Sequence, residues 1–265
     1  MTETRSVCCY CGTGCGVVIE HDGQRIAGVR GDAQHPANLG RLCTKGATLH
    51  HGAATQAGRA LDPMHRRARG APLERLGWDS ALDLAAQRFA DLITQHGPDA
   101  VAFYVSGQLL TEDYYVFNKL ARALVGTNNI DSNSRLCMSS AVAGYKATLG
   151  ADAVPCCYED LAAADHLLIA GSNTAWAHPI VFRRIEEARR ARPELTITVI
   201  DPRRTETAEF ADDFLQIAPG SDLLLYNAML HVLVWEDLID RDFIRAHTSG
   251  FDALRAQLAD CSPGN

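Results

Sequence analysis

The stretch Cys8-Cys9-Tyr10-Cys11-Gly12-Thr13-Gly14-Cys15-Gly16 sets Cys8, Cys11 and Cys15 at C-x2-C-x3-C spacing among glycines, and Cys43 follows later. Four thiolates gathered by tight glycine turns can surround a soft metal centre, either an iron–sulfur cube or one tetrahedral zinc ion. Structural zinc sites more often consist of two C-x2–4-C pairs, so the solitary fourth cysteine favours iron–sulfur, with zinc as the alternative. We therefore predict Cys8, Cys11, Cys15 and Cys43 as metal ligands and Cys9 as a thiol that does not bind the metal.

The composition restricts the class of protein. The chain has 265 residues, of which 47% are hydrophobic and 22% charged, which is typical of a globular protein and not of a disordered one. The formal net charge of −7 argues against nucleic acid as a partner. No run approaches the about 18–20 apolar residues of a membrane span, and the N-terminus has neither an apolar signal core nor a twin-arginine pair. We expect no membrane partner and a cytoplasmic location.

The pattern along the chain predicts an α/β fold. Residues 16–20 and 25–29 read as a β hairpin, and residues 56–77 as an irregular connection. From Trp78 onward, apolar strand-like runs alternate with amphipathic helical segments, which is typical of a parallel sheet. The expected helices are residues 78–97, 111–126, 178–193 and 223–238. The expected strands lie within residues 100–107, 165–173, 195–205 and 210–222, and the first of them is expected to be buried on both faces.

The N-terminal motifs resemble a known family. Gly31-Asp32, His35-Pro36-Ala37-Asn38 and Gly40-Arg41-Leu42-Cys43-Thr44-Lys45-Gly46, with the cysteine stretch, are similar to the cluster domain of the molybdopterin oxidoreductases. These are bis-molybdopterin-guanine-dinucleotide enzymes that include nitrate reductases and formate dehydrogenases. The resemblance implies a [4Fe-4S] cluster on the four cysteines, with Lys45 between cluster and pterin. Cys9 departs from the family pattern, which usually has proline there.

A second motif implies a molybdenum ligand. Residues 133–146 (NSRLCMSSAVAGYK) and 157–161 (CYEDL) resemble the assimilatory nitrate reductases and, less closely, the periplasmic ones. A lone cysteine is more often a small buried residue, but a polar run is costly to bury without partners. By the resemblance, Cys137 is the molybdenum ligand and the catalytic residue. Formate dehydrogenases tend to have histidine after this cysteine, whereas this chain has Met138, which favours nitrate chemistry.

Two loops that follow expected strands, residues 171–179 and 201–205, lie where open parallel sheets bind ligands. Neither contains GxGxxG, and from spacing alone both can equally be ordinary strand-to-helix turns. The resemblance implies that they hold one guanine dinucleotide. The cofactor-binding residues it implies, besides Lys45, are Gln108, Asn133, Gly171, Ser172, Asn173, His178, Asp201, Arg203, Gly220 and Asp222.

Together these features predict a small β-rich [4Fe-4S] domain followed by parallel-sheet, dinucleotide-binding-like α/β domains. The expected boundaries are 1–56 for the cluster domain, 57–140 for an α/β domain leading to Cys137, and 141–265 for an incomplete Rossmann-like domain. The resemblance is closest to the catalytic subunit of assimilatory nitrate reductase, of which the chain would be the N-terminal portion.

The implied activity passes electrons from the cluster to molybdenum bis-molybdopterin guanine dinucleotide and reduces nitrate to nitrite. The implied donor is an NAD(P)H-dependent flavoprotein, a ferredoxin or a flavodoxin. Two alternatives stay open: a formate dehydrogenase of the same family, and a truncated, non-catalytic iron–sulfur electron-transfer protein.

The first prediction concerns the chain on its own. Family members are longer and carry a further domain that binds the second pterin dinucleotide, so we expect the 265-residue chain alone to have little or no nitrate reductase activity. An assay of the purified chain with reduced viologen and nitrate measures this. Robust turnover would contradict the prediction.

Overall fold

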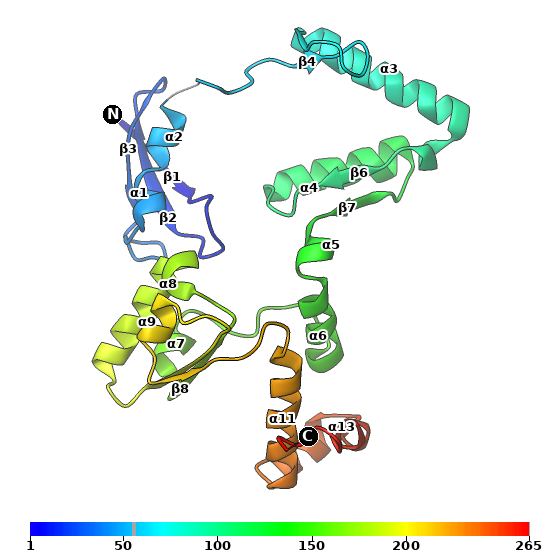
Figure 1. Ribbon diagram of the computed structural model, residues 1–265. Helices are drawn as coiled ribbons and strands as arrows, with labels where there is room; N and C mark the ends of the chain where they lie inside the picture. Colours follow the sequence, from blue (N-terminus) through cyan, green and yellow to red (C-terminus); the bar gives the residue numbers. More distant parts are fainter. Residues whose placement is uncertain (55–56, 265) are drawn as a thin grey trace. The chain divides into compact units, whose positions relative to one another are not determined.

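The computed structural model describes residues 1–54 and 57–264 (Figure 1). The chain forms two compact units: Met1–Ala54 together with Cys156–Asn265, and Thr55–Pro155. Each unit is described separately below. The expected three-domain division, whose first boundary at residue 56 lies outside the described residues, stays a prediction.

The N-terminal part is a three-stranded antiparallel sheet in the order β1-β2-β3, with strands Thr2–Val7, Gly16–His21 and Ile26–Gly31. The predicted hairpin is confirmed as β2 and β3, with a register shift at Glu20/His21. Strand β1 was not predicted, because its six side chains are all exposed and give no apolar alternation. The short helices α1 (Thr44–Ala47) and α2 (Leu49–Ala53) pack against β3.

The second part of this unit is a parallel sheet in the order β10-β9-β8. Its strands are β8 (His166–Ala170), β9 (Thr196–Ile200) and β10 (Asp213–Leu215), which confirms the predicted parallel α/β arrangement. The β-branched residues of the central strand β9 suit a strand with both faces covered, and its last four residues are buried.

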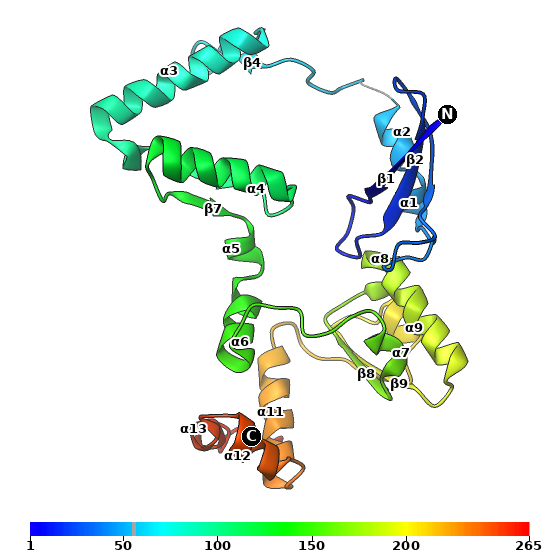
Figure 2. The same cartoon turned by 180° about the vertical axis from the view of Figure 1, so that it is seen from behind.

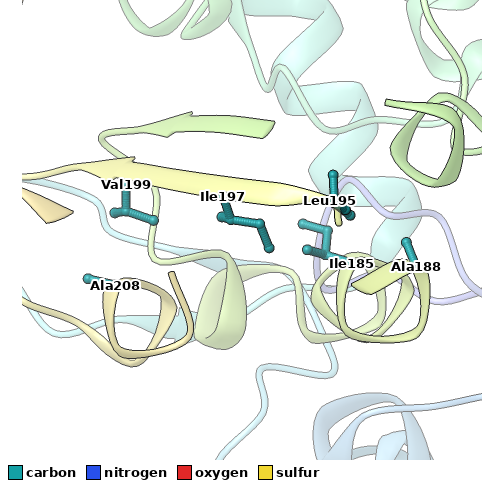
Figure 3. Packing of buried hydrophobic residues seen from close by; sticks show 6 residues of the cluster. All are labelled: Ile185, Ala188, Leu195, Ile197, Val199 and Ala208. Atoms are coloured by element: carbon teal, nitrogen blue, oxygen red, sulfur yellow. The ribbon is translucent and has the colours of Figure 1, made fainter. Parts of the chain in front are cut away.

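One face of β9 carries the core. Ile197 and Val199, two residues apart and therefore on the same face, point toward helices α9 and α10 (Figure 3). The described helices around this sheet are α7 (Asp160–Ala163), α8 (Thr174–Ala177), α9 (Pro179–Ala191) and α10 (Glu206–Glu209). The buried cluster consists of Ile185, Ala188, Leu195, Ile197, Val199 and Ala208. The expected helix at 178–193 is confirmed as α9.

The same unit ends in three helices, α11 (Asp222–Trp235), α12 (Arg241–His247) and α13 (Phe251–Gln257). The helix expected at 223–238 is confirmed as α11. The N-terminus of α12 is capped by Asp240, whose carboxylate accepts a hydrogen bond of 2.8 Å from the amide of Phe243. In the ranges that the structure describes, none of the helices combines the length and apolar character needed to cross a bilayer.

The other unit is built around a two-stranded parallel pair, β6 (Phe103–Val105) and β7 (Ile130–Ser132). Its remaining elements are β4 (Met64–His65), β5 (Glu74–Arg75), α3 (Trp78–His96), η1 (Pro98–Ala100), α4 (Thr111–Asn118), η2 (Lys119–Val125), α5 (Ser134–Cys137) and α6 (Ser139–Leu149). The predicted helices at 78–97 and 111–126 are confirmed, the second ending in a π-helical stretch before the left-handed Gly126. The described part of the expected irregular connection contains the small β4–β5 hairpin.

The strand expected at 100–107 is shorter and less buried than predicted. It has three residues, and Tyr104 is 70% exposed. The reason is that only one face is covered: the Phe103 ring contacts Phe89 of α3 and Phe117 of α4, at centroid distances of 5.9 and 6.3 Å. The expectation that this strand is buried on both faces was wrong.

The second prediction concerns the contribution of the hydrophobic core to stability. Leu195 is fully buried in the cluster beside β9, so Leu195→Ala should lower the free energy of unfolding by about 2–5 kcal/mol. Leu238→Ala, at a mostly exposed leucine, is the matched control and should cost less than about 1 kcal/mol. Urea unfolding followed by circular dichroism measures both. Equal losses in the two variants would contradict the assigned core.

Candidate functional site

Three of the four predicted cluster ligands lie on the loop between β1 and β2, and Cys43 immediately precedes α1. The loop is closed at its base, where the amide of Cys8 donates to the carbonyl of Cys15 over 2.8 Å. Cys15 is buried, whereas Cys8, Cys11 and Cys43 are partly exposed. The fold therefore presents the four thiols from two loops of one small domain.

The four thiols lie close enough to influence one another's ionisation. Burial, together with the charges of Cys11, Cys8 and Cys43, raises the pKa of the Cys15 thiol to about 11. Burial also raises the pKa of Cys8, with the charges of Cys9, Cys43 and Cys11 acting in the same direction. Four thiolates in one place repel one another, and iron ions supply the positive charge that removes this cost.

These four thiols therefore fit an iron–sulfur cluster: they are soft ligands, they lie on glycine-rich loops, and their charges affect one another's pKa. Over residues 1–54 and 57–264, no three or more His, Cys, Asp or Glu side chains form a group that could hold a metal ion directly. The assignment of the four cysteines as ligands stays a prediction.

Asn38 ties the two ligand-bearing loops together. Its side chain is 1% exposed, and its Oδ1 accepts from the amide of Gly16 over 2.8 Å. Its Nδ2 donates to the carbonyls of Gly16 and Arg41, at 3.0 and 2.7 Å. One buried amide thus connects the residue after Cys15 with the chain two residues before Cys43.

Two glycines allow this close approach. A Cβ on Gly16 would lie 2.3 Å from Cγ of His35, and a Cβ on Gly31 would lie 2.0 Å from the carbonyl oxygen of Gly40. No side chain larger than hydrogen fits at either position without a backbone shift. The Gly and Asn residues of the N-terminal motifs therefore have a packing reason to be there. Lys45 lies in the exposed part of α1, two residues after Cys43.

The residues predicted to lie near molybdenum come together at the carboxyl ends of β6 and β7. Gln108 is on the loop after β6, and Asn133 and Cys137 follow β7. The side chain of Asn133 accepts a hydrogen bond from the amide of Gly107, and its carbonyl accepts from the amide of Cys137 over 2.9 Å. Asn133 therefore links both loops, and Cys137 is exposed at the end of α5.

The predicted dinucleotide loops lie at the carboxyl ends of β8 and β9. Asn173 accepts from the hydroxyl of Thr207 over 3.0 Å, and Thr207 in turn accepts from the amide of Ala175. The carboxylate of Asp201 accepts from the amide of Arg203 over 2.8 Å, which orders that turn. Thr207 lies in α10, so the 171–179 loop is bonded to the helix that follows the 201–205 loop, at the edge of the sheet where parallel sheets bind nucleotides.

The other predicted residues of this group lie nearby in sequence. Gly171 and Ser172 begin the loop after β8, and His178 immediately precedes α9. Gly220 and Asp222 lie at the start of α11, on the chain that leaves β10. No hydrogen bond among the described residues joins Gly220 or Asp222 to the other two loops.

A buried hydroxyl at this edge of the sheet, that of Thr205, is consistent with a bound polar ligand such as a dinucleotide. Thr205 is buried, and its hydroxyl oxygen has no hydrogen-bond partner among the described residues. Because an unsatisfied buried hydroxyl is costly, a polar ligand on the 201–205 loop would relieve it. Sequence reasoning missed Thr207, Thr205 and Asn38, although all three lie within or beside the quoted motifs.

The fold and the predicted site residues together are those expected of a redox protein, with a cysteine-rich domain that would hold an iron–sulfur cluster and parallel strand ends that would take a nucleotide cofactor. Comparison with models of protein families supports this class of protein. Residues 1–53 match the molybdopterin oxidoreductase Fe4S4 domain, and residues 59–252 match molybdopterin oxidoreductase. The chain belongs to the molybdopterin oxidoreductase family. This membership indicates a [4Fe-4S] cluster and a molybdenum bis-molybdopterin guanine dinucleotide as its cofactors.

Individual relatives are similar over nearly the whole chain. The nitrate reductase of Klebsiella oxytoca is 51% identical over 92% of this chain, and that of Symbiobacterium thermophilum 45% over 94%. The alpha subunit of F420-dependent formate dehydrogenase 1 from Methanococcus maripaludis is 36% identical over 97%. The chain spans 27%, 33% and 37% of these three proteins, respectively.

A solved structure confirms the fold. The acetylene hydratase of Pelobacter acetylenicus superimposes with a TM-score of 0.82 at 25% identity, over 97% of this chain and 35% of that enzyme. The predicted α/β class and the family resemblance are thereby confirmed.

The third prediction tests the role of Asn38. Asn38→Ala removes three hydrogen bonds: the carbonyl of Gly16 keeps its bond from the amide of Asp32, but the buried amide of Gly16 and the carbonyl of Arg41 lose the side-chain partner. A buried backbone group left unpaired costs about 1–3 kcal/mol. The variant should therefore lose stability to urea and retain less iron than the parent protein. Gln34→Ala, which changes an exposed amide on the same loop, is the control and should retain its iron. Equal iron content in the two variants would contradict the role of Asn38.

Proposed function

We propose that the chain is the N-terminal portion of the catalytic subunit of a molybdenum-dependent nitrate reductase. The observation that carries this proposal is the higher identity to nitrate reductases, 51% and 45%, than to the formate dehydrogenase subunit, 36%. Met138 after Cys137 supports the same choice, because a histidine at this position could move a substrate proton and methionine cannot.

In this proposal, Cys8, Cys11, Cys15 and Cys43 hold the cluster, and Cys137 binds molybdenum. When bound, the two cofactors supply electron transfer and the removal of one oxygen from nitrate, which needs two electrons and two protons and yields nitrite and water. The chain's own residues position these groups. Asn38 fixes the two cluster loops, and Asn133 fixes the loop of Cys137 against Gly107. Lys45, beside Cys43, is the proposed neighbour of both cluster and pterin.

One guanine dinucleotide is proposed to lie at the carboxyl edge of β8 and β9. Asn173 and Asp201 are ordered there by the bonds described above, and Arg203 offers a forked donor for phosphate or guanine. Gln108, Gly171, Ser172, His178, Gly220 and Asp222 complete the proposed binding set.

The location and the donor are also proposals. We infer a cytoplasmic, assimilatory role, supported by 40% identity to the assimilatory nitrate reductase of Haloferax mediterranei. The proposed donor is an NAD(P)H-dependent flavoprotein, a ferredoxin or a flavodoxin, with no nucleic acid or membrane as partner. The proposed organisation is a cluster domain at 1–56, an α/β domain at 57–140 and a dinucleotide domain from 141.

The fourth prediction tests substrate and molybdenum ligand together. The complete, cofactor-loaded protein should reduce nitrate with reduced viologen and should not oxidise formate with oxidised viologen. Cys137→Ser should abolish nitrate reduction while leaving the cluster signal in electron paramagnetic resonance (EPR) unchanged, because the serine oxygen replaces only the proposed molybdenum ligand.

Cys156→Ser, at an exposed cysteine with no proposed role, is the matched control and should keep full activity. Formate oxidation without nitrate turnover would favour the formate dehydrogenase alternative. Iron without molybdenum in the complete protein would favour the non-catalytic electron-transfer alternative.

A further inference from the structure

A tyrosine from the α/β part reaches the turn between two proposed cluster ligands. The hydroxyl of Tyr158 donates to the carbonyl of Thr13 over 2.8 Å, across 145 residues of sequence. Thr13 is buried and lies between Cys11 and Cys15. All of these residues belong to the same compact unit, and Figures 1 and 2 both show α8 and α9 beside the N-terminal sheet.

Arg184 of α9 joins the same contact. Its guanidinium lies 5.1 Å from the centre of the Tyr158 ring, and its Nε donates to the carbonyl of Ala37 over 3.2 Å. Its Nη2 also donates to Ala37 and to Pro36. These carbonyls immediately precede Asn38, which fixes the cluster loops. Tyr158 and Arg184 therefore hold both ligand-bearing loops against the α/β layer.

The groups that contact the Arg184 guanidinium neutralise little of its positive charge. The side chain is only 14% exposed, and its close partners are neutral carbonyls and an aromatic face. The carboxylate of Glu159 lies 3.8 Å from the guanidinium but is 72% exposed, so water screens it. A partly buried cation of this kind acts on neighbouring charges through a lower effective dielectric than water.

The charge of Arg184 and the charges of the cysteine thiols act on the same side chain, the phenol of Tyr158. Burial raises the pKa of the Tyr158 hydroxyl; the charges of Cys15 and Cys11 raise it and that of Arg184 lowers it. The phenol thus lies within electrostatic reach of the thiols on one side and of the guanidinium on the other. Charge, hydrogen bonding and solvent exposure near an iron–sulfur cluster are the factors that set its reduction potential.

We propose that Tyr158 and Arg184 are positioning residues for the [4Fe-4S] cluster, and that the charge of Arg184 makes the cluster easier to reduce. Reduction adds one electron, delivered by the external donor protein, and increases the negative charge at the site, so a fixed nearby cation favours the reduced form. Tyr158 holds the Cys11–Cys15 turn in place and covers it from water. The inference rests on the cluster assignment within the proposed function and not on nitrate as substrate.

The test is an EPR-monitored redox titration of the anaerobically purified full chain. Arg184→Gln should lower the equilibrium constant for cluster reduction by up to about tenfold, which is about 59 mV for a one-electron couple. Arg184→Lys keeps the charge and should restore most of the potential. Arg190→Gln removes a mostly exposed charge from the same helix and should leave the potential unchanged.

Tyr158→Phe tests the positioning role, because it keeps the ring beside Arg184 and removes only the hydroxyl bonded to Thr13. This variant should release iron to a chelator several-fold faster than the parent, with an unchanged circular dichroism spectrum. It also keeps the proposal testable if Arg184→Gln fails to fold.

Full cluster occupancy with an unchanged potential in Arg184→Gln would overturn the electrostatic role. Unchanged iron release in Tyr158→Phe would overturn the positioning role. Absence of a cluster signal in the parent protein would instead count against the cluster assignment, so the two failures are distinguishable.

Discussion

The structure of the cluster domain depends on one buried side chain, the amide of Asn38. Three hydrogen bonds from this amide hold the residue after Cys15 and the chain just before Cys43. These bonds act directly between two loops that carry mutually repelling thiolates. The amide is neutral and fully paired, so it orders the loops without adding negative charge beside the proposed cluster. Arg184 continues this arrangement outward by binding the carbonyls just before Asn38.

A second constraint comes from parallel strand pairing. The predicted molybdenum-loop residues and most of the predicted dinucleotide residues follow strands that run side by side in the same direction, β6 with β7 in one unit and β8 with β9 in the other. Parallel pairing brings the loops after these strands to one edge, and a polar side chain there bonds to a loop. Asn133 bonds to Gly107 of the other loop, and Thr207 of α10 bonds to Asn173 and Ala175 of the loop after β8. A hydrogen-bonding side chain at the ends of paired parallel strands thus orders both the proposed molybdenum loop and the proposed dinucleotide loop after β8.

Much of this was predictable from sequence because it depends on local patterns. The alternation of Gly16–Glu20 predicted β2, and the 3.6-residue period from Trp78 predicted α3. Strand β1 was missed because its side chains are exposed. The burial of the strand around Phe103 was overestimated, because a run of apolar residues does not reveal whether a helix packs on one face of the strand or on both. The spacing of the cysteines predicts all four as ligands, and this assignment stays a prediction. The spacing did not predict Asn38 or the bond from Tyr158 to Thr13, because contacts between distant residues leave no periodic signal in a single sequence.

We infer that the two loops fixed by Asn38 carry a [4Fe-4S] cluster. Iron and zinc analysis of the anaerobically purified protein, combined with EPR after reduction, tests it most directly. A [4Fe-4S] cluster on these loops should give about four iron atoms per chain and the signal of one reduced cluster. About one zinc ion per chain with no iron and no signal would contradict it.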